Sequence, residues 1–217
     1  MQVNEIFTSL SGEADGFGMQ GGLATFVRLQ GCNLNCSWCD TERAQHFNKR
    51  KDQSVEEVAS QCTNHHIIIT GGEPLMQVVE VEQLIETLCP YGRKEHLVTI
   101  ETNGAIPITI FTAHQRYETL RWVVDYKLGS SGMSRYMLPE VFNYLFELDV
   151  IKFVIADLQD YRQAKELVLK NQQWCAKKIF SPLTPGGYPK LLAKAIVEDK
   201  LEGVTLSLQL HKLLHLA

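Results

Sequence analysis

The stretch Cys32-Asn33-Leu34-Asn35-Cys36-Ser37-Trp38-Cys39-Asp40-Thr41 places three thiols close together in the chain. The cysteines are separated by three and then two residues, so the loop can curl until all three sulfurs face one inorganic centre. A zinc ion takes four protein ligands, whereas a cubane iron–sulfur cluster held by three cysteines leaves one iron open. Three thiols therefore favour a cluster. The alternative is a zinc knuckle that a distant residue such as His46 completes.

The composition indicates a single domain over residues 1–217, because 45% of its 217 residues are hydrophobic. A net charge of −4 gives no electrostatic reason to expect a nucleic-acid partner. The sequence shows no membrane-spanning run and no secretory signal, so we expect a cytoplasmic protein. In that compartment six cysteines indicate thiols or metal ligands rather than disulfides. We interpret Cys62, Cys89 and Cys175 as small hydrophobic residues.

Strands and helices are expected to alternate along most of the chain. Apolar runs predict strands at residues 24–29, 67–70, 97–101, 122–126, 150–156, 176–180 and 204–208. Helical spacing predicts helices after the capping box at Ser54 and at residues 78–88, 140–148, 161–170 and 189–200. Residues 7–13 are expected to form a turn-like approach to the first strand. This pattern favours an α/β fold, an incomplete, open TIM-like barrel of about six to seven mainly parallel strands.

Polar residues follow nearly every predicted strand. Gly71-Gly72-Glu73-Pro74 stands directly after residues 67–70, and its glycines let main-chain groups approach a ligand closely. The other exits carry Arg28, Thr70, residues 101–103, 125–127, 181–184 and 209–212. Strand ends of a barrel-like sheet converge on one mouth, where ligands bind. Taken singly, Arg28 could instead face solvent and the other residues could be ordinary loop polarity.

The spacing C-x-x-x-C-x-x-C, with an aromatic residue in the second gap and Asp-Thr behind it, resembles the radical S-adenosylmethionine (SAM) superfamily. The Gly-Gly-Glu-Pro sequence resembles that superfamily's SAM-binding motif. The resemblance implies a [4Fe–4S] cluster on Cys32, Cys36 and Cys39, with the methionine amino and carboxylate groups of SAM on the open iron. We expect such a cluster to be destroyed by oxygen.

A closer resemblance covers most of the chain. It is carried by Asn-Glu-Ile-Phe, Ser-Leu-Ser-Gly-Glu, Phe-Val-Arg-Leu-Gln-Gly-Cys, Trp-Cys-Asp-Thr, Ile-Thr-Gly-Gly-Glu-Pro and Leu-Ser-Leu-Gln-Leu-His-Lys. These runs are similar to the 7-carboxy-7-deazaguanine synthase family of lyases in queuosine-type deazapurine biosynthesis. The resemblance implies conversion of 6-carboxy-5,6,7,8-tetrahydropterin into 7-carboxy-7-deazaguanine with loss of ammonia, through hydrogen abstraction by a 5′-deoxyadenosyl radical and ring contraction. SAM would be a regenerated cofactor, and magnesium would be required.

The same resemblance implies three groups of site residues, whose positions it supplies. The SAM-binding residues would be Trp38, Cys39, Asp40, Gly72, Glu73, Asp125, Tyr126, Lys127, Ser181, Pro182, Leu183 and Thr184. The pterin would contact Leu10, Ser11, Gly12, Glu13, Arg28, Thr70 and the terminal carboxylate of Ala217. Thr41 would bind magnesium, a hard ion that keeps several waters. No side chain is singled out as a catalytic acid or base.

These roles are chemically reasonable. Arg28 can hold a substrate carboxylate with paired hydrogen bonds, and Glu13 can accept hydrogen bonds from the guanidine-like edge of a pterin. The chain departs from the family's usual pattern at Ser11, at Asp125-Tyr126 and before Ser181.

Two rival functions are open to the sequence: a glycyl-radical enzyme activase, and a non-enzymatic iron–sulfur or zinc module. The family resemblance further implies an electron donor such as flavodoxin, and a homodimer.

Overall fold

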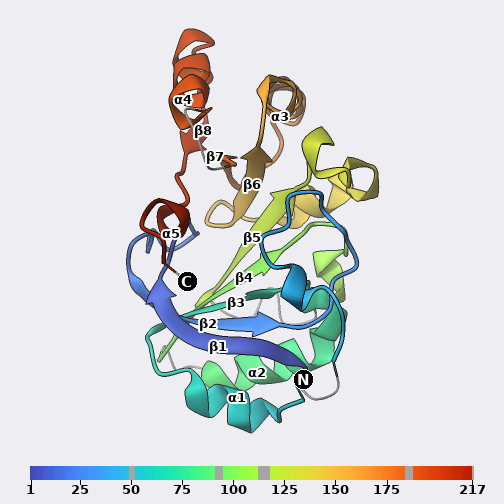
Figure 1. Cartoon of the computed structure of the whole chain (residues 1–217), viewed down its shortest axis with the longest axis vertical. Helices are drawn as coiled ribbons and strands as arrows, with labels where there is room; N and C mark the ends of the chain where they lie inside the picture. Colours follow the sequence, from blue (N-terminus) through green and yellow to red (C-terminus); the bar gives the residue numbers. More distant parts are fainter. Residues whose placement is uncertain (49–51, 91–94, 112–117, 184–187, 217) are drawn as a thin grey trace.

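The computed structural model describes residues 1–48, 52–90, 95–111, 118–183 and 188–216, and its centre is one eight-stranded sheet (Figure 1). The strands are β1 (Val3–Leu10), β2 (Leu23–Leu29), β3 (His66–Gly71), β4 (Leu97–Thr102), β5 (Leu120–Tyr126), β6 (Val150–Ile155), β7 (Lys177–Pro182) and β8 (Val204–Leu206). They lie side by side in chain order. Only β1 is antiparallel to its neighbour, and β2 to β8 are parallel. The sheet stays open, and β2 to β8 are its parallel strands, which confirms the expected incomplete barrel of about six to seven mainly parallel strands.

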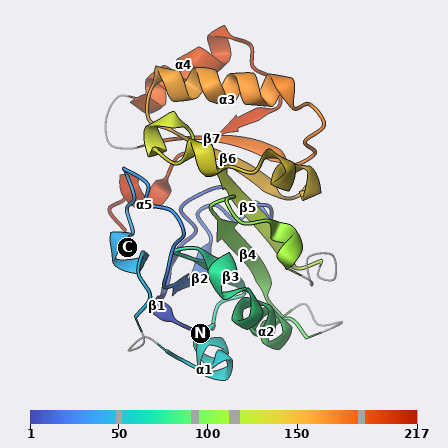
Figure 2. The ribbon, with the colours of Figure 1, turned by 90° about the vertical axis from the view of Figure 1, so that its right-hand side faces the viewer.

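The helices follow sequence signals that the structure confirms in most cases. In α1 (Val55–Gln61) the Ser54 side chain accepts from Glu57 N while the Glu57 side chain accepts from Ser54 N, a capping box. The other helices are α2 (Val78–Leu88), α3 (Leu158–Lys170), α4 (Tyr188–Glu198) and α5 (Leu210–Leu213). Figure 2 shows α3 and α4 beside β6 and β7, while α1 and α2 lie together near β3. Among the described residues, no helix combines the length and apolar character that spanning a bilayer requires.

Side chains alternate between the two faces of the parallel strands, and the two faces have different chemistry. On β6, Ile151, Phe153 and Ile155 belong to the main core beneath the helices. A second, smaller apolar cluster of Val123, Val150 and Ile179 lies apart from that core and packs with Ala14. Lys152 and Val154, which alternate with the core residues of β6, line a cavity instead. Functional side chains are therefore expected on the cavity-facing positions only.

Two local predictions were wrong. Phe7–Leu10 of the expected turn-like approach belongs to β1, because Thr8, Ser9 and Leu10 pair in register with Thr25, Ala24 and Leu23. The predicted helix at residues 140–148 is absent, and Pro139–Tyr144 forms a 3₁₀ helix instead. Its apolar spacing is real, since Val141, Phe142 and Leu145 are buried. The chain then turns sharply into β6, with Asp149 accepting hydrogen bonds from Phe146 N and Trp122 N.

Candidate active site

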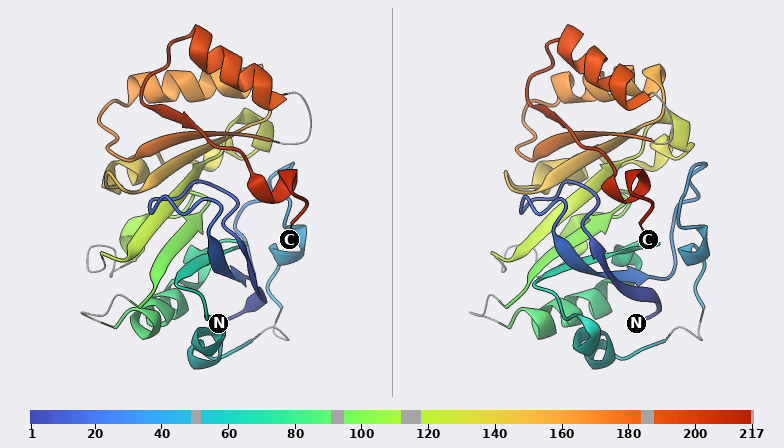
Figure 3. Two further views of the ribbon diagram at one scale, coloured as in Figure 1. Left: turned by 90° about the vertical axis from the view of Figure 1, so that its left-hand side faces the viewer. Right: turned by 60° about the vertical axis from the view of Figure 1, so that its left-hand side comes forward.

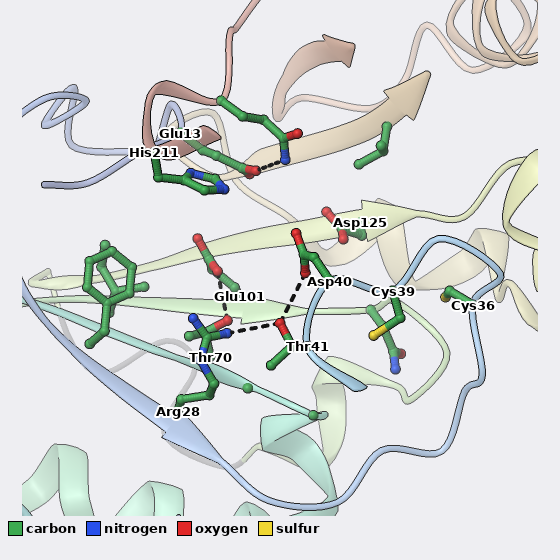
Figure 4. Close-up of a pocket in the computed structure, with 18 of the residues that line it drawn as sticks. Glu13, Arg28, Cys36, Cys39, Asp40, Thr41, Thr70, Glu101, Asp125 and His211 are labelled. Atoms are coloured by element: carbon green, nitrogen blue, oxygen red, sulfur yellow. Dashed lines mark hydrogen bonds between the residues drawn. The ribbon is translucent and has the colours of Figure 1, made fainter. Parts of the chain in front are cut away.

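One cavity of about 410 Å³ lies where the strand ends meet the cysteine loop (Figure 4). Its walls come from the ends of β2 to β6, the β1–β2 loop, the cysteine loop and the C-terminal segment. Figure 3 shows α5 passing close to the segment that follows the cysteines, and the ion pair between Lys212 Nζ and Asp40 Oδ2, at 2.9 Å, joins the two. Segments far apart in the sequence thus enclose one site.

The Gly-Gly-Glu turn holds the base of the cysteine loop. Gly72 N donates to Leu29 O at 3.0 Å, and Glu73 N donates to Gly31 O at 2.7 Å. A Cβ added to Gly72 would lie 1.9 Å from Gly31 O, so this approach requires glycine. Cys32 N donates to Gln45 O at 2.8 Å on the other side of the loop. The turn after β3 and the thiol loop therefore form one hydrogen-bonded unit.

All three predicted cluster ligands, Cys32, Cys36 and Cys39, line the cavity as free thiols. Burial raises the pKa of the Cys32 and Cys36 thiols above the ordinary value, and the nearby Lys127 ammonium acts against that rise at Cys36. Two N–H groups approach the Cys32 sulfur: Leu34 N at 3.5 Å and Asn103 Nδ2 at 3.8 Å. Hydrogen bonds of this kind to cysteine sulfur tune iron–sulfur clusters.

The chemistry of this loop fits a cluster better than a single ion. Cys32 and Cys39 lie close enough to Cys36 to raise the pKa of its thiol. Over the part of the chain that the structure describes, no three His, Cys, Asp or Glu side chains are gathered tightly enough for one metal ion. His46, the distant zinc ligand that the sequence allowed, is exposed and does not line the cavity. The three thiols around an open cavity fit a larger group with one face left for a second ligand.

The cysteine loop is supported from below by Ser130. Ser37 Oγ donates to Ser130 O at 2.6 Å, and Trp38 Nε1 donates to Ser130 Oγ at 3.1 Å. Ser130 is held in turn by Asp160, which lies near the start of α3 and is only 1% exposed. The Asp160 carboxylate accepts hydrogen bonds from Ser130 N, Ser130 Oγ and Ala156 N. A buried carboxylate thus orients Trp38 through one serine.

Replacing Asp160 with asparagine is expected to destabilise the fold by about 1–3 kcal/mol, because an amide cannot accept all three of those hydrogen bonds. The reconstituted variant should also lose its cluster faster in chelator, since Trp38 and Ser37 lose their anchor. Urea unfolding and the decay of the cluster absorption measure the two effects. Asp157→Asn is the matched control, because asparagine caps a helix as well as aspartate. Equal losses in both variants would contradict the assigned role.

Four charged side chains form a chain of ion pairs across the cavity. Lys152 Nζ contacts the Glu13 carboxylate and lies 3.1 Å from Asp125 Oδ1. Lys127 Nζ lies 2.5 Å from Asp125 Oδ2 and 5.3 Å from the centre of the Trp38 ring. These ion pairs connect the β1–β2 loop, which carries Glu13, to Trp38 of the cysteine loop.

A second polar group lies around Arg28 (Figure 4). Arg28 Nε donates to Glu5 Oε1 at 2.8 Å, and Arg28 Nη1 lies 3.3 Å from Thr41 Oγ1. Thr41 donates to Asp40 Oδ1 at 3.0 Å. Desolvation raises the pKa of the Asp40 carboxyl, but the Lys212 ammonium and the Thr41 hydroxyl lower it to about 2. Asp40 is therefore a carboxylate at neutral pH, next to a hydroxyl oxygen.

Glu101 and His211 complete the polar wall. Thr70 Oγ1 donates to Glu101 Oε2 at 2.8 Å, and burial raises the pKa of the Glu101 carboxyl. His211 lies over Gly12, where an added Cβ would come within 2.2 Å of the imidazole Nδ1. Burial lowers the pKa of His211, which favours the neutral imidazole. Both acceptors and donors therefore face the cavity.

The cavity brings together most residues that the sequence singled out. Lining it are Leu10, Gly12, Glu13, Arg28, Cys32, Cys36, Trp38, Cys39, Asp40, Thr41, Thr70, Gly72, Asp125, Lys127 and Leu183. The side chains of Ser11, Glu73, Tyr126, Ser181 and Pro182 are buried elsewhere. Thr184 and Ala217 lie outside the described residues.

Two of those departures have clear physical causes. Tyr126 points to the opposite face of β5 and packs on Phe142 and Phe153, as strand alternation requires. The Glu73 carboxylate accepts from Leu75 N, Thr102 Oγ1 and Asn103 N, so it fixes the turn rather than facing the cavity.

Sequence reasoning missed Lys152 entirely and gave no role to Glu101 or Gln209. A signal for Lys152 was available, because it is the one charged residue in the apolar strand Val150–Ile155. A buried lysine is rarely unpaired, so a facing carboxylate could have been expected.

Comparison with known proteins agrees with this geometry. Residues 26–130 match the Radical SAM superfamily. A 7-carboxy-7-deazaguanine synthase of Clostridium acetobutylicum is 31% identical over 98% of this chain and 95% of its own length. One from Methanospirillum hungatei is 34% identical over 100% of this chain and 86% of its own length. The crystal structure of QueE from Escherichia coli superimposes with a TM-score of 0.70 at 21% identity, covering 97% of this chain and 94% of that one, which shows a shared fold.

The open parallel sheet and the three-cysteine loop define the class as a radical SAM enzyme. Within that class, the chain belongs to the 7-carboxy-7-deazaguanine synthase family, since relatives above 30% identity extend over nearly its whole length.

Proposed function

We propose that the chain converts 6-carboxy-5,6,7,8-tetrahydropterin into 7-carboxy-7-deazaguanine with loss of ammonia. The main support is the full-length similarity to synthases of that name. Further support comes from the cavity itself, which is lined by Arg28, Glu13 and Thr70 as well as by the three cysteines. The rival function, a glycyl-radical enzyme activase, has no support from these relatives, because they carry the name of the synthase.

The pterin would bind on the side of the cavity formed by β2, β3 and the β1–β2 loop. Arg28 would hold the substrate carboxylate with paired N–H donors. Glu13 would accept from the guanidine-like edge, where a neutral side chain would leave donors unpaired. Thr70 lies next to Arg28, its register partner on the neighbouring strand. The remaining proposed contacts are Leu10, Ser11, Gly12 and Ala217.

The cofactors would occupy the side next to the cysteine loop. Cys32, Cys36 and Cys39 would hold a [4Fe–4S] cluster, and Trp38, Asp40 and Gly72 would lie along SAM. When bound, these groups supply the one-electron chemistry that removes a hydrogen atom from carbon 6 of the pterin and returns it later. Asp125, Lys127 and Leu183 would border SAM, and Thr184 stays a proposed contact. Of the other proposed SAM residues, Glu73, Tyr126, Ser181 and Pro182 would act through their backbone or as support, because their side chains are buried away from the cavity.

The remaining parts of the proposal concern metal and partners. Thr41 would bind magnesium, since its hydroxyl oxygen is hard and stands beside the Asp40 carboxylate. A flavodoxin-type donor would supply electrons, and residues 1–217 would act as one domain in a homodimer.

The deciding experiment is anaerobic reconstitution with iron and sulfide, followed by incubation with SAM, reductant and the carboxytetrahydropterin, with and without magnesium. We expect ammonia and the deazapurine product, no stoichiometric loss of SAM, and a higher rate with magnesium. Mass spectrometry of the product and an ammonia assay measure the result. SAM cleavage that requires an added protein, without product from the pterin, would instead support an activase.

A further inference from the structure

Lys152 is an unusual residue for the strand that carries it. The strand β6 is otherwise apolar, and its side chains are buried at all six positions. Lys152 is 7% exposed and faces the cavity rather than the core. Its register partner is Asp125 on β5. The fold thus places an ammonium group from β6 on the cavity wall, beside Asp125 of β5.

The partners of Lys152 come from two parts of the chain with different proposed roles. Its ammonium contacts Glu13, which belongs to the β1–β2 loop and is also fixed by Gln209 Nε2 at 2.6 Å from Oε1. The same ammonium lies 3.1 Å from Asp125 Oδ1, whose other oxygen pairs with Lys127. Glu13 is proposed to face the pterin, and Asp125 and Lys127 to face SAM. Lys152 therefore stands at the boundary between the two halves.

The ammonium of Lys152 affects the ionisation of both Glu13 and Asp125. Burial raises the pKa of the Glu13 carboxyl, but the Lys152 ammonium and the hydrogen bond from Gln209 bring it below the ordinary value. The Asp125 carboxyl follows the same pattern, with Lys127 and Lys152 as the opposing cations. Burial lowers the pKa of Lys152, yet Asp125, Glu13 and Glu101 together raise it well above the ordinary value. An uncharged residue here would remove the ion pair of the buried Glu13 carboxylate and would leave Asp125 paired with Lys127.

We propose that Lys152 is a positioning residue that holds Glu13 and Asp125 at a fixed separation, and thereby aligns the pterin-binding side of the cavity with the cofactor-binding side. The proposal rests on the function proposed above. Lys152 itself need not touch the reacting atoms. Its ammonium keeps the Glu13 carboxylate in its acceptor form and in place for the donors of the pterin edge.

This role of Lys152 predicts that pterin binding depends on pH. Besides Lys152 and Asp125, the groups that act on Glu13 are Glu101 and His211, with Lys127 behind Asp125. Since the pKa of Glu13 is lowered, its ionised form persists at neutral pH and is lost only as the pH falls. Without Lys152 that pKa rises, so binding that needs the carboxylate fails at a higher pH.

The test compares Lys152→Met, Lys152→Arg and the surface control Lys165→Met, whose lysine pairs with Asp199 at 2.8 Å on the outside of the fold. Carboxyl ¹³C shifts in the apo protein, assigned with Glu13→Gln, give the titration of Glu13 directly. In Lys152→Met we expect this pKa to rise by at least about one unit. In Lys152→Arg and Lys165→Met it should stay near the wild-type value.

Ligand binding supplies the second readout. Calorimetry with the reconstituted enzyme should show pterin affinity about tenfold weaker in Lys152→Met at neutral pH. The fall of affinity at low pH, the acid limb of the pH profile, should move to higher pH in this variant. Lys152→Arg should retain the wild-type acid limb with intermediate affinity, because the charge remains while the reach changes. If Lys152→Met does not fold, Lys152→Arg still tests the separation through its affinity.

An unchanged Glu13 titration in Lys152→Met would overturn the proposal, as would a loss of stability with wild-type pH behaviour. Wild-type pterin affinity in Lys152→Arg would overturn it too, because the changed reach of the side chain would then have no effect on binding. The titration is measured without substrate, so it remains decisive if the wild-type enzyme fails to convert the pterin. That failure would count against the proposed function alone.

Discussion

Cys36→Ala is expected to abolish activity while leaving the fold intact. Cys36 is partly exposed on the cavity wall, so its removal leaves no large void in the core. Two remaining thiols cannot hold a cluster that needs three protein ligands and an open iron. After anaerobic reconstitution, bound iron and sulfide should fall to background and the visible cluster absorption should disappear. Circular dichroism and thermal unfolding should match the wild-type protein without cluster.

Cys175→Ala is the matched control, because Cys175 lies far along the chain from the loop and is exposed. The interpretation of Cys175 as a buried small hydrophobic residue was therefore wrong, while Cys62 and Cys89 are buried as expected. It should retain full iron content and activity. Cluster retention in Cys36→Ala, or its loss in Cys175→Ala, would show that the ligand assignment is wrong.

Gly72→Ala is expected to destabilise the protein by about 3 kcal/mol or more, and to lower cluster content as well. The new Cβ would meet Gly31 O at 1.9 Å, Gly31 C at 2.4 Å and Ala44 O at 2.7 Å. All three atoms are backbone, so no side-chain rotation can relieve the contact. Any shift of Gly31 also moves Cys32, because the two residues are adjacent. Urea unfolding of the protein without cluster, followed by iron analysis after reconstitution, measures both effects.

Gly129→Ala provides the comparison for a glycine that its neighbours do not restrict. Its added Cβ would lie 3.6 Å from Gln163 Oε1 and 3.9 Å from Asp160 Oδ1, which are ordinary contacts. We expect a change within about 0.5 kcal/mol. Similar losses for the two glycine variants would mean that the close approach at Gly72 does not limit stability.

Much of the fold could be predicted because its signals are local. The capping box at Ser54 and the helix Val78–Leu88 depend on neighbouring residues, and the structure has both where the sequence indicated. The first strand escaped prediction, because β1 is an antiparallel edge strand whose pairing with β2 is not visible in its own composition. The segment around Phe142 has the apolar spacing of a helix, but it forms only a short 3₁₀ helix, from Pro139 to Tyr144.

The candidate site also has features that the sequence predicts and features that it does not. The sequence by itself determined the thiol spacing, the flexible Gly-Gly turn and the position of Arg28 near a strand end, because each is set by the order of residues in one short run. Only the tertiary structure decided which polar residues face the cavity. It turned Tyr126 into the core, used the Glu73 carboxylate to fix a turn, and set Lys152 between Glu13 and Asp125. Those outcomes depend on strand register and on loops that return from distant parts of the chain, and side-chain alternation assigns a face only when the neighbouring strands are known.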